Sequence, residues 1–352
     1  MKRGFSAVIA AGTAALLLCG CSAKDASAQF IAMDTNISLR LSGTKATAAV
    51  TAAEKEIREL ETLLSRTLPD SEVSRLNDAD GTPQRLSYRV HALLETAQSY
   101  TISTGGAFDV TIAPVVSAWG FTEAEFRVPS QDELDRLLSY VGPEHIDLSD
   151  ADIDHVSLAP HTQIDLGGIA KGYATDLMHA ICEEDNIPSG TVALGGNIYV
   201  RGTKEGGALW QVGVQDPAGS GLAGIIGLSD AYAVTSGGYQ RYFEQDGVIY
   251  HHIIDPATGY PADSDLTSVT VIAPALITDG INAHPGNGTM CDALSTALFV
   301  MGEEEALEFR RSSGLDFDLV LITADGRVVI TDGIAEHFTK QEGSGYQYET
   351  VS

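Results

Sequence analysis

Basic residues are scarce in this chain of 352 residues. Lysine and arginine together number 21, against 48 aspartates and glutamates, and the formal net charge is −27 at pH 7. This balance argues against a nucleic-acid partner, because phosphate backbones bind basic surfaces. Anionic lipid headgroups would be repelled for the same reason, so attachment to a membrane would need a covalent lipid rather than surface charge.

Cysteine is also rare, with four residues, two of them close to the N-terminus. The chain has no CxxC pair and no cluster of histidine with cysteine, so a structural zinc site has no support. Cys182 and Cys291 remain in the body of the protein. A disulfide between them is one option, and two separate buried thiols acting as small apolar side chains are the favoured one.

Long apolar runs do not occur after the first 20 residues. Two basic residues precede an apolar run from Ala7 to Leu18, which is typical of a signal peptide and too short to span a bilayer permanently. The letters "LCGC" that end at Cys21 resemble a bacterial lipobox. We therefore expect a lipoprotein signal peptide over residues 1–20 and a lipid on Cys21, which would hold the protein at the extracytoplasmic side of the cell membrane. An ordinary secretory signal cut elsewhere is the alternative.

The rest of the chain divides by composition into three parts. A lipidated N-terminus and small-residue spacer is expected over residues 21–29, a globular domain over 30–340 and a loose polar tail over 341–352. Hydrophobic residues make up 44% of the chain, enough for a large core. No repeat of solenoid or propeller length is visible.

The globular part mixes helical and strand periodicities without regular βαβ alternation, which predicts an α+β fold. Six segments have helical patterns: 44–66, 88–103, a short helix after the capping-box pair Ser130 and Glu133, 171–184, 292–301 and 303–311. Nine segments have strand patterns: 36–43, 162–166, 191–201, 209–215, 225–228, 248–254, 267–272, 318–322 and 327–331.

One glycine-rich stretch, "DLGGIAKGYATD" at residues 165–176, has the order of a phosphate-binding turn. A strand is expected to end near Asp165 and a helix to begin near Ala170, so that a glycine turn leads into a helix N-terminus. Lys171 adds a positive charge there. The stretch is not a Walker A loop, and ordinary turn chemistry explains it equally well.

Two further stretches contain candidate functional side chains. In "HHIIDPATGYP" (251–261), His252 ends an apolar strand beside a rigid loop and suits a general base, although His251 and His252 could simply face opposite sides of a strand. In "CDALSTALFVMG" (291–302), Asp292 and Thr296 lie one helical turn apart and suit Mg²⁺, with Mn²⁺ as an alternative. The simpler interpretation makes Asp292 the N-cap of its helix.

These stretches occur together with others in an order that resembles the ApbE family of FAD:protein FMN transferases. The resemblance runs from about Met33 to Thr331. It is carried by nine motifs: "AMDT" (32–35), "DSEVSRLN" (70–77), "GGAFDVTIAPVVSAWGF" (105–121), "DLGGIAKGYATD" (165–176), "GGNIYVRG" (195–202), "VTSGGYQRYF" (234–243), "HHIIDPATGYP" (251–261), "SVTVIAP" (268–274) and "DALSTALFVMG" (292–302). Any single motif could arise by chance, whereas the ordered set is specific.

The resemblance implies a two-lobed α+β fold that binds FAD and Mg²⁺ in a cleft between the lobes. It makes His252 the catalytic base. It implies that Mg²⁺ is bound by the side chains of Asp292 and Thr296 and by the backbone carbonyl of Gly168. It implies that the FAD site is lined by Met33, Ala107, Phe108, Asp109, Asp165, Lys171 and Ile254.

The implied reaction transfers FMN from FAD to a threonine or serine hydroxyl of a target protein and releases AMP. The acceptor would be a flavin-carrying subunit of an exported or membrane redox complex. Two rival functions remain open. The same site could hydrolyse FAD to FMN and AMP, or the chain could be a lipoprotein that binds a flavin without catalysis, although a passive binder has no need of His252, Asp292 and Thr296 together.

The chain departs from the family pattern at two places. Family members commonly have a tyrosine where this chain has Thr67, so an aromatic lid over the flavin would be missing or supplied elsewhere. An additional stretch, "NAHPGNGTMC" (282–291), precedes the expected metal-binding helix. It would either shape the entrance for the acceptor or form an enlarged surface loop. His284 in this stretch is assigned no role.

Overall fold

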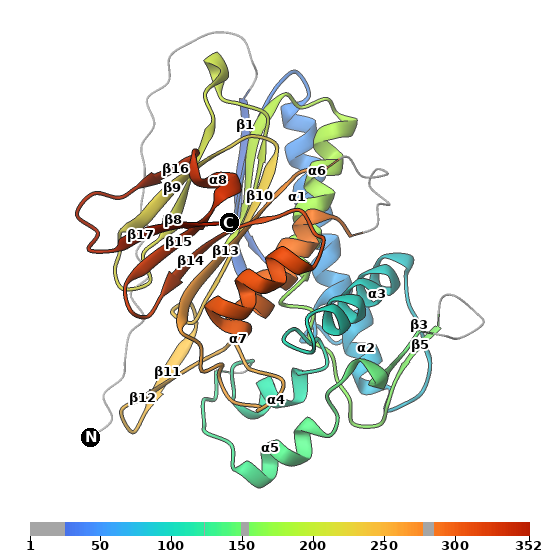
Figure 1. Ribbon diagram of the computed structural model, residues 1–352. Coiled ribbons are helices and arrows are strands. Elements are labelled where there is room, and N and C mark those ends of the chain that lie inside the picture. The colour runs from blue at the N-terminus through green and yellow to red at the C-terminus, as the bar shows by residue number, and fades with distance from the viewer. Residues whose placement is uncertain (1–24, 123, 149–154, 277–284) are drawn as a thin grey trace, which may run out of the picture.

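A nine-stranded sheet lies at the centre of the computed structural model, which describes residues 25–122, 124–148, 155–276 and 285–352 (Figure 1). Neighbouring strands are antiparallel, except that β15 and β17 are parallel. In spatial order the strands are β1 (Asp25–Ala32), β2 (Thr35–Ser42), β6 (Ser189–Leu194), β7 (Asn197–Arg201), β10 (Ala231–Gly237), β13 (Leu266–Pro274), β14 (Asp318–Thr323), β15 (Arg327–Thr331) and β17 (Gln347–Val351).

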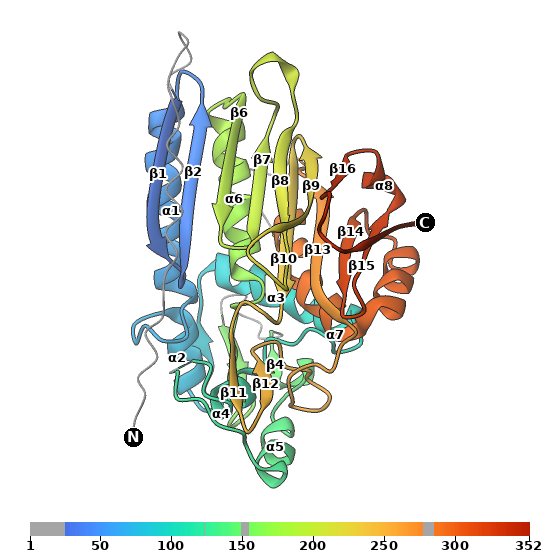
Figure 2. The same cartoon turned by 90° about the vertical axis from the view of Figure 1, so that its left-hand side faces the viewer.

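Three long helices cover one face of this sheet, and a smaller sheet covers part of the other (Figures 1 and 2). The helices are α1 (Ala46–Leu64), α6 (Ala170–Glu184) and α7 (Asn287–Ser312). The smaller sheet consists of β16 (Phe338–Lys340), β9 (Leu222–Leu228) and β8 (Trp210–Gln215), with the short helix α8 (Asp332–Ala335) beside β14 and β15.

A second lobe lies at one end of the large sheet and is built mainly from residues 65–166 (Figure 1). Its helices are α2 (Glu72–Asp78), α3 (Tyr88–Ser103), α4 (Ala113–Ala118) and α5 (Gln131–Leu138). Its strands are β3 (Gln84–Arg85), β4 (Ile146–Asp147) and β5 (His155–Leu158), and the hairpin of β11 (Tyr242–Gln245) and β12 (Val248–His251) reaches it from the large lobe. The predicted α+β class is thus confirmed.

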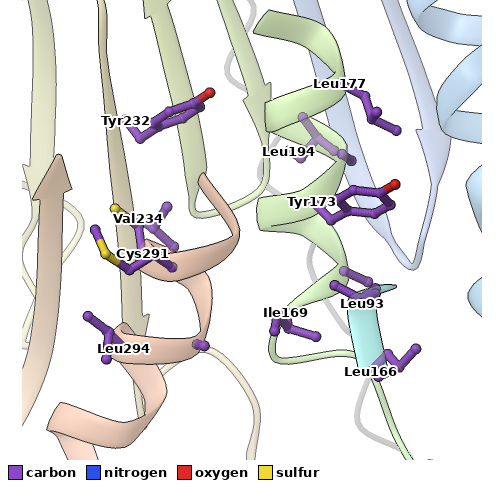
Figure 3. Close-up of a cluster of buried hydrophobic side chains, with 14 of the residues drawn as sticks. Leu93, Leu166, Ile169, Tyr173, Leu177, Leu194, Tyr232, Val234, Cys291 and Leu294 are labelled. Atoms are coloured by element: carbon purple, nitrogen blue, oxygen red, sulfur yellow. The ribbon is translucent and has the colours of Figure 1, made fainter. Parts of the chain in front are cut away.

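Three hydrophobic clusters account for these layers. The largest fills the space between the large sheet and its helices, where Tyr173 of α6, Leu294 of α7 and Tyr232 of β10 are buried (Figure 3). A second cluster separates the two stacked sheets. The third surrounds the fully buried Trp119 in the second lobe, whose indole nitrogen donates to the Gly259 carbonyl at 2.7 Å. Cys182 and Cys291 are free buried thiols, which confirms the favoured interpretation.

Several predicted elements occur with adjusted bounds. The apolar stripe of α1 is buried as its spacing predicts, and Ser130 caps α5 by accepting the backbone N–H of Glu133 at 3.3 Å. The Glu133 carboxylate pairs with Arg127 instead of closing a capping box. The segments 292–301 and 303–311 both belong to α7, which begins at Asn287 and bends at Gly302, whose φ is +81°.

Two predictions about strands are wrong. Residues 162–166 form an isolated bridge at Gln163 rather than a strand. Residues 191–201 form two strands, β6 and β7, around a turn. The spacer and the tail are also shorter than expected. Residues from Asp25 on form β1, which pairs with β2, and residues 347–351 form β17, which pairs with β15. Within the described ranges, no helix has the length and apolar character needed to cross a bilayer.

The C-terminal strand leads to a stability prediction. Tyr348 of β17 packs partly buried beside the cluster between the two sheets, and its hydroxyl donates to the Ala223 carbonyl at 2.8 Å. Replacing Tyr348→Ala should lower the free energy of unfolding by about 2 kcal/mol, since apolar contact and a hydrogen bond are both lost. Urea denaturation measures this change. Thr350 is exposed in the same strand, so Thr350→Ala is the control and should stay within about 0.5 kcal/mol; equal losses would mean that β17 does not pack as described.

Candidate active site

The turn before α6 is held in place by side chains on both sides. One Asp165 carboxylate oxygen accepts the backbone N–H of Gly167 at 2.8 Å, and the other accepts from the Arg66 guanidinium at 3.1 Å. The Lys171 ammonium donates to the Gly167 carbonyl at 2.8 Å. α6 begins at Ala170 as predicted, so the glycine turn does lead into a helix N-terminus. Such an end, with a lysine beside it, suits an anionic group.

Asp292 lies in the second turn of α7 and is therefore not the N-cap of its own helix. Its side chain is 5% exposed, and Oδ2 accepts the backbone N–H of Gly172 at 2.8 Å, so that it caps α6 instead. The Lys171 ammonium lies 3.7 Å from Oδ1. This arrangement leaves Oδ1 as the less occupied oxygen, beside the positive end of α6.

Thr296 lies one turn further along α7 and faces the glycine turn. A Cβ atom placed on Gly168 would be 3.8 Å from Thr296 Oγ1 and 3.1 Å from the ring of Phe108. Ser236 Oγ lies 2.8 Å from Ser295 Oγ and 3.4 Å from Thr296 Oγ1. Ser295 donates back to the Asp292 carbonyl at 2.9 Å, as hydroxyls in a helix often do.

Together these groups fit a hard divalent cation. One carboxylate, one hydroxyl and the backbone of a glycine turn supply only oxygen donors, and Mg²⁺ takes few protein ligands because it keeps waters and binds substrate phosphates. Among the residues described, no three His, Cys, Asp or Glu side chains gather in one place, so the donor set does not resemble a zinc or iron cage. The residues present are thus suited to Mg²⁺ at the N-terminus of α6.

His252 follows β12 directly and is half-buried. Its Nδ1 lies 3.2 Å from the Arg241 carbonyl, which can only accept, so Nδ1 carries the proton and Nε2 presents a lone pair. Burial is the main cause that lowers the pKa of His252 to about 4, and the nearby charge of Lys171 acts in the same direction. The imidazole is therefore neutral at pH 7, as a general base must be.

The segment around Phe108 is placed partly as predicted. Phe108 is buried against Gly168, and Ala107 beside it is half-buried. Asp109 is bound within its own loop. Its Oδ1 accepts hydrogen bonds from the backbone N–H and the hydroxyl of Thr111 at 2.8 and 2.5 Å. Burial raises the pKa of this carboxyl. Asp109 thus holds the shape of its loop through Oδ1.

Two of the predicted residues, Met33 and Ile254, make their described contacts with other parts of the structure. Met33 and Asp34 form the two-residue turn between β1 and β2, with φ of +50° and +55°, and the Met33 N–H donates to Glu61 at 2.7 Å. Ile254 is buried in the second lobe beside Trp119 and forms a bridge with Pro261. Met33 thus belongs to a hairpin turn of the large sheet, and Ile254 to the loop that follows β12.

Sequence reasoning missed three residues at the site. Arg66 binds Asp165 and also donates to Ser117 at 2.6 Å. Ser236 lies in the "VTSGGYQRYF" stretch, and Asp176 ends the "DLGGIAKGYATD" stretch. Their motifs were visible, but their partners are remote in sequence. Arg66 directly precedes Thr67, the position at which family members commonly have a tyrosine, and Thr67 is exposed.

The additional stretch before α7 is not an enlarged surface loop over all its length. Residues 287–291 form the first turn of α7, and Cys291 is fully buried. His284 and residues 277–284 lie outside the described ranges. The part that is described therefore extends the helix and contacts α6, because glycines at 172 and 288 let the two backbones approach.

Comparison with known proteins gives a consistent result. The ApbE family matches residues 33–319. A curated FAD:protein FMN transferase of Treponema pallidum is 33% identical over 92% of this chain and 94% of its own length, and one of Haemophilus influenzae is 32% identical over 82% of each.

Solved structures agree in fold. The Thermotoga maritima ApbE protein superposes with a TM-score of 0.80 at 31% identity, over 91% of this chain and all of its own. The flavin transferase ApbE of Vibrio cholerae has a TM-score of 0.73 at 27% identity, over 92% of this chain and 99% of its own.

The pKa of His252 gives a prediction for stability. Because the folded value of about 4 lies below the ordinary 6.5, the unfolded chain binds the proton first. The free energy of unfolding is therefore unaffected by this group above about pH 6.5 and falls as the pH drops towards 4, by at most about 1.4 kcal/mol per pH unit. Urea denaturation across this range should show a shallower pH dependence for His252→Gln than for the wild type. Parallel curves would contradict the lowered pKa.

Proposed function

The chain belongs to the ApbE family and is an FAD:protein FMN transferase, and we propose that it transfers FMN to a threonine or serine hydroxyl of a target protein in a Mg²⁺-dependent reaction. The acceptor would be a flavin-carrying subunit of an exported or membrane redox complex. The observation that carries this proposal is that Asp292 and Thr296 both lie at the N-terminus of α6, where Asp292 accepts the Gly172 N–H and Thr296 lies beside Gly168.

The chemistry follows from the groups at this place. The acceptor hydroxyl oxygen forms a bond to the FMN-side phosphorus of FAD, the bond from that phosphorus to the bridging oxygen breaks, and AMP leaves. His252 Nε2 accepts the hydroxyl proton, because Nδ1 is held by the Arg241 carbonyl. FAD would lie along the Phe108 and Asp165 segments with its pyrophosphate at the N-terminus of α6.

The negative charge of the phosphates would be neutralised in two ways. Lys171 and the N–H groups of the first turn of α6 supply positive charge at fixed positions. Asp292, Thr296 and the Gly168 carbonyl would bind Mg²⁺, which when present neutralises the phosphate oxygens and orients the pyrophosphate. Mn²⁺ is the alternative ion.

Transfer can be tested directly with protein that starts at Asp25. Incubation with FAD, Mg²⁺ and a candidate acceptor should give a flavin-fluorescent acceptor band on a denaturing gel. Asp292→Ala should abolish the band, because the cation loses its carboxylate ligand. His252→Gln should slow labelling by about 10²- to 10⁴-fold, the usual contribution of a general base, while FAD binding is retained.

One control variant and the identity of the products distinguish transfer from the two rival functions. Asp255→Asn, in the loop that follows His252, changes a carboxylate bound only within its own turn and should leave labelling unchanged. Free FMN and AMP without a labelled band would favour the hydrolase function instead. FAD binding without either product would favour a passive flavin-binding protein.

We also propose that the protein is exported and anchored by a lipid on Cys21. The support is the signal-peptide pattern of residues 1–20 and the lipobox-like "LCGC". The net charge of −27 gives no attraction to an anionic membrane, so the lipid would carry the attachment alone. β1 begins at Asp25, so only residues 22–24 would separate the lipidated cysteine from the folded domain.

Anchoring predicts a change in fractionation. The full chain expressed in a bacterium with lipoprotein processing should incorporate labelled palmitate and sediment with membranes. Cys21→Ala should abolish both, because the thiol that receives the lipid is gone. Cys182→Ala is the control and should retain the label, since that thiol is buried in the fold. Unlabelled wild-type protein secreted without its first residues would support the ordinary secretory signal.

A further inference from the structure

The N-terminus of α7 is capped by a side chain of α6. Both oxygens of the Asp176 carboxylate take part: Oδ2 accepts the backbone N–H of Gly286 at 2.8 Å, and Oδ1 accepts that of Gly288 at 2.8 Å. Oδ2 also accepts the N–H and the hydroxyl of Thr289 at 2.9 and 2.6 Å. The N-cap residue of α7 is Gly286, which has no side chain that could cap the helix. Asp176 therefore provides the cap that residues 286–289 lack.

The N-terminus of α6 is in turn capped by a side chain of α7. Asp292 of α7 accepts the N–H of Gly172 in the first turn of α6, whose N-cap Ile169 has no side-chain hydrogen bond. The two helices are antiparallel, since Asp176 meets Gly288 and Gly172 meets Asp292. Each helix is thus capped by a carboxylate of the other.

Glycine makes this contact as close as it is. A Cβ on Gly172 would lie 2.3 Å from the Gly288 carbonyl oxygen, and a Cβ on Gly288 would lie 2.8 Å from that of Gly172. Any side chain there would push the helices apart. Asp176 is 1% exposed, and a buried carboxylate is costly unless donors surround it, so the four hydrogen bonds allow little displacement of α7.

We propose that Asp176 is a positioning residue for the divalent-cation site: by fixing the start of α7 it sets where Asp292 and Thr296 stand relative to the Gly167–Gly168 turn. This rests on the proposed Mg²⁺ dependence. Asp176 contacts α7 at Thr289, three residues before Asp292, so a shift or rotation of this turn is passed to Asp292 and Thr296 through the helix. Residues that orient metal ligands typically change metal affinity by about 10- to 100-fold when replaced.

The test measures Mn²⁺ binding directly, with the metal alone as the probe and the free ion followed by EPR. Asp176→Asn replaces one oxygen by an amide that faces N–H donors and should weaken Mn²⁺ binding by about 10- to 100-fold. Asp176→Glu keeps the charge but displaces the oxygens, and should weaken it similarly. An affinity for Asp176→Glu equal to the wild type would overturn positioning, because loss of charge alone would then explain Asp176→Asn.

Controls separate this inference from a general loss of stability. Tyr348→Ala lowers stability far from the site and should leave Mn²⁺ affinity unchanged at temperatures where it is folded. FAD binding in EDTA, followed by flavin fluorescence, should be the same for wild type and both Asp176 variants. Variants that bind Mn²⁺ as tightly as the wild type would reduce Asp176 to a structural role.

Two further arms cover the remaining outcomes. If the Asp176 variants do not fold, Thr289→Val removes one of the four hydrogen bonds and should weaken Mn²⁺ binding a few-fold; an unchanged affinity would overturn the inference. Asp292→Ala tests the metal site itself. Equal Mn²⁺ binding by wild type and Asp292→Ala would refute that site, whereas a loss with Asp292→Ala but none with the Asp176 variants refutes only the role of Asp176.

Discussion

Two helix N-termini, each capped by a carboxylate from the other helix, hold the centre of this structure together. Asp176 of α6 binds the start of α7, and Asp292 of α7 binds the start of α6. The first N–H groups of a helix have no partner within it, and a buried carboxylate has no water, so each satisfies the other. The exchange aligns two antiparallel helices whose facing ends carry the groups proposed for catalysis.

The second lobe depends on this alignment for the rest of the site. The Asp165 N–H donates to the Val110 carbonyl at 2.8 Å, which joins the glycine turn to the loop of Phe108. Trp119 reaches across to Gly259 in the loop that follows His252. In the proposed reaction, the helix pair on the sheet would bind the phosphates and the cation, the second lobe would contact the flavin, and the β11–β12 hairpin would position the base.

The local patterns of the sequence predicted the long helices and several strands correctly, but not β1, β10 or α2. The stripe of α1, the start of α6 at Ala170 and the cap of α5 by Ser130 depend on neighbours within a few residues. Errors occurred where partners are remote. β17 contains polar and aromatic letters that looked like a loose tail, yet it pairs with β15, and residues 162–166 have strand character but only one bridge. Pairing of backbone groups across the sheet decides such cases.

The sequence by itself determined the acidic charge, the α+β class, the family and the chemical types of the candidate residues, because these depend on composition and on short ordered motifs. Only the tertiary structure decided what each side chain does. The simpler interpretation made Asp292 the cap of its own helix, but it caps α6, and Asp109, which the resemblance places along the FAD site, accepts hydrogen bonds from Thr111. The partner of a carboxylate is set by which helices pack together, and Asp176 binds backbone groups that lie 110 to 113 residues later in the chain. Spacing along the sequence carries no record of that packing.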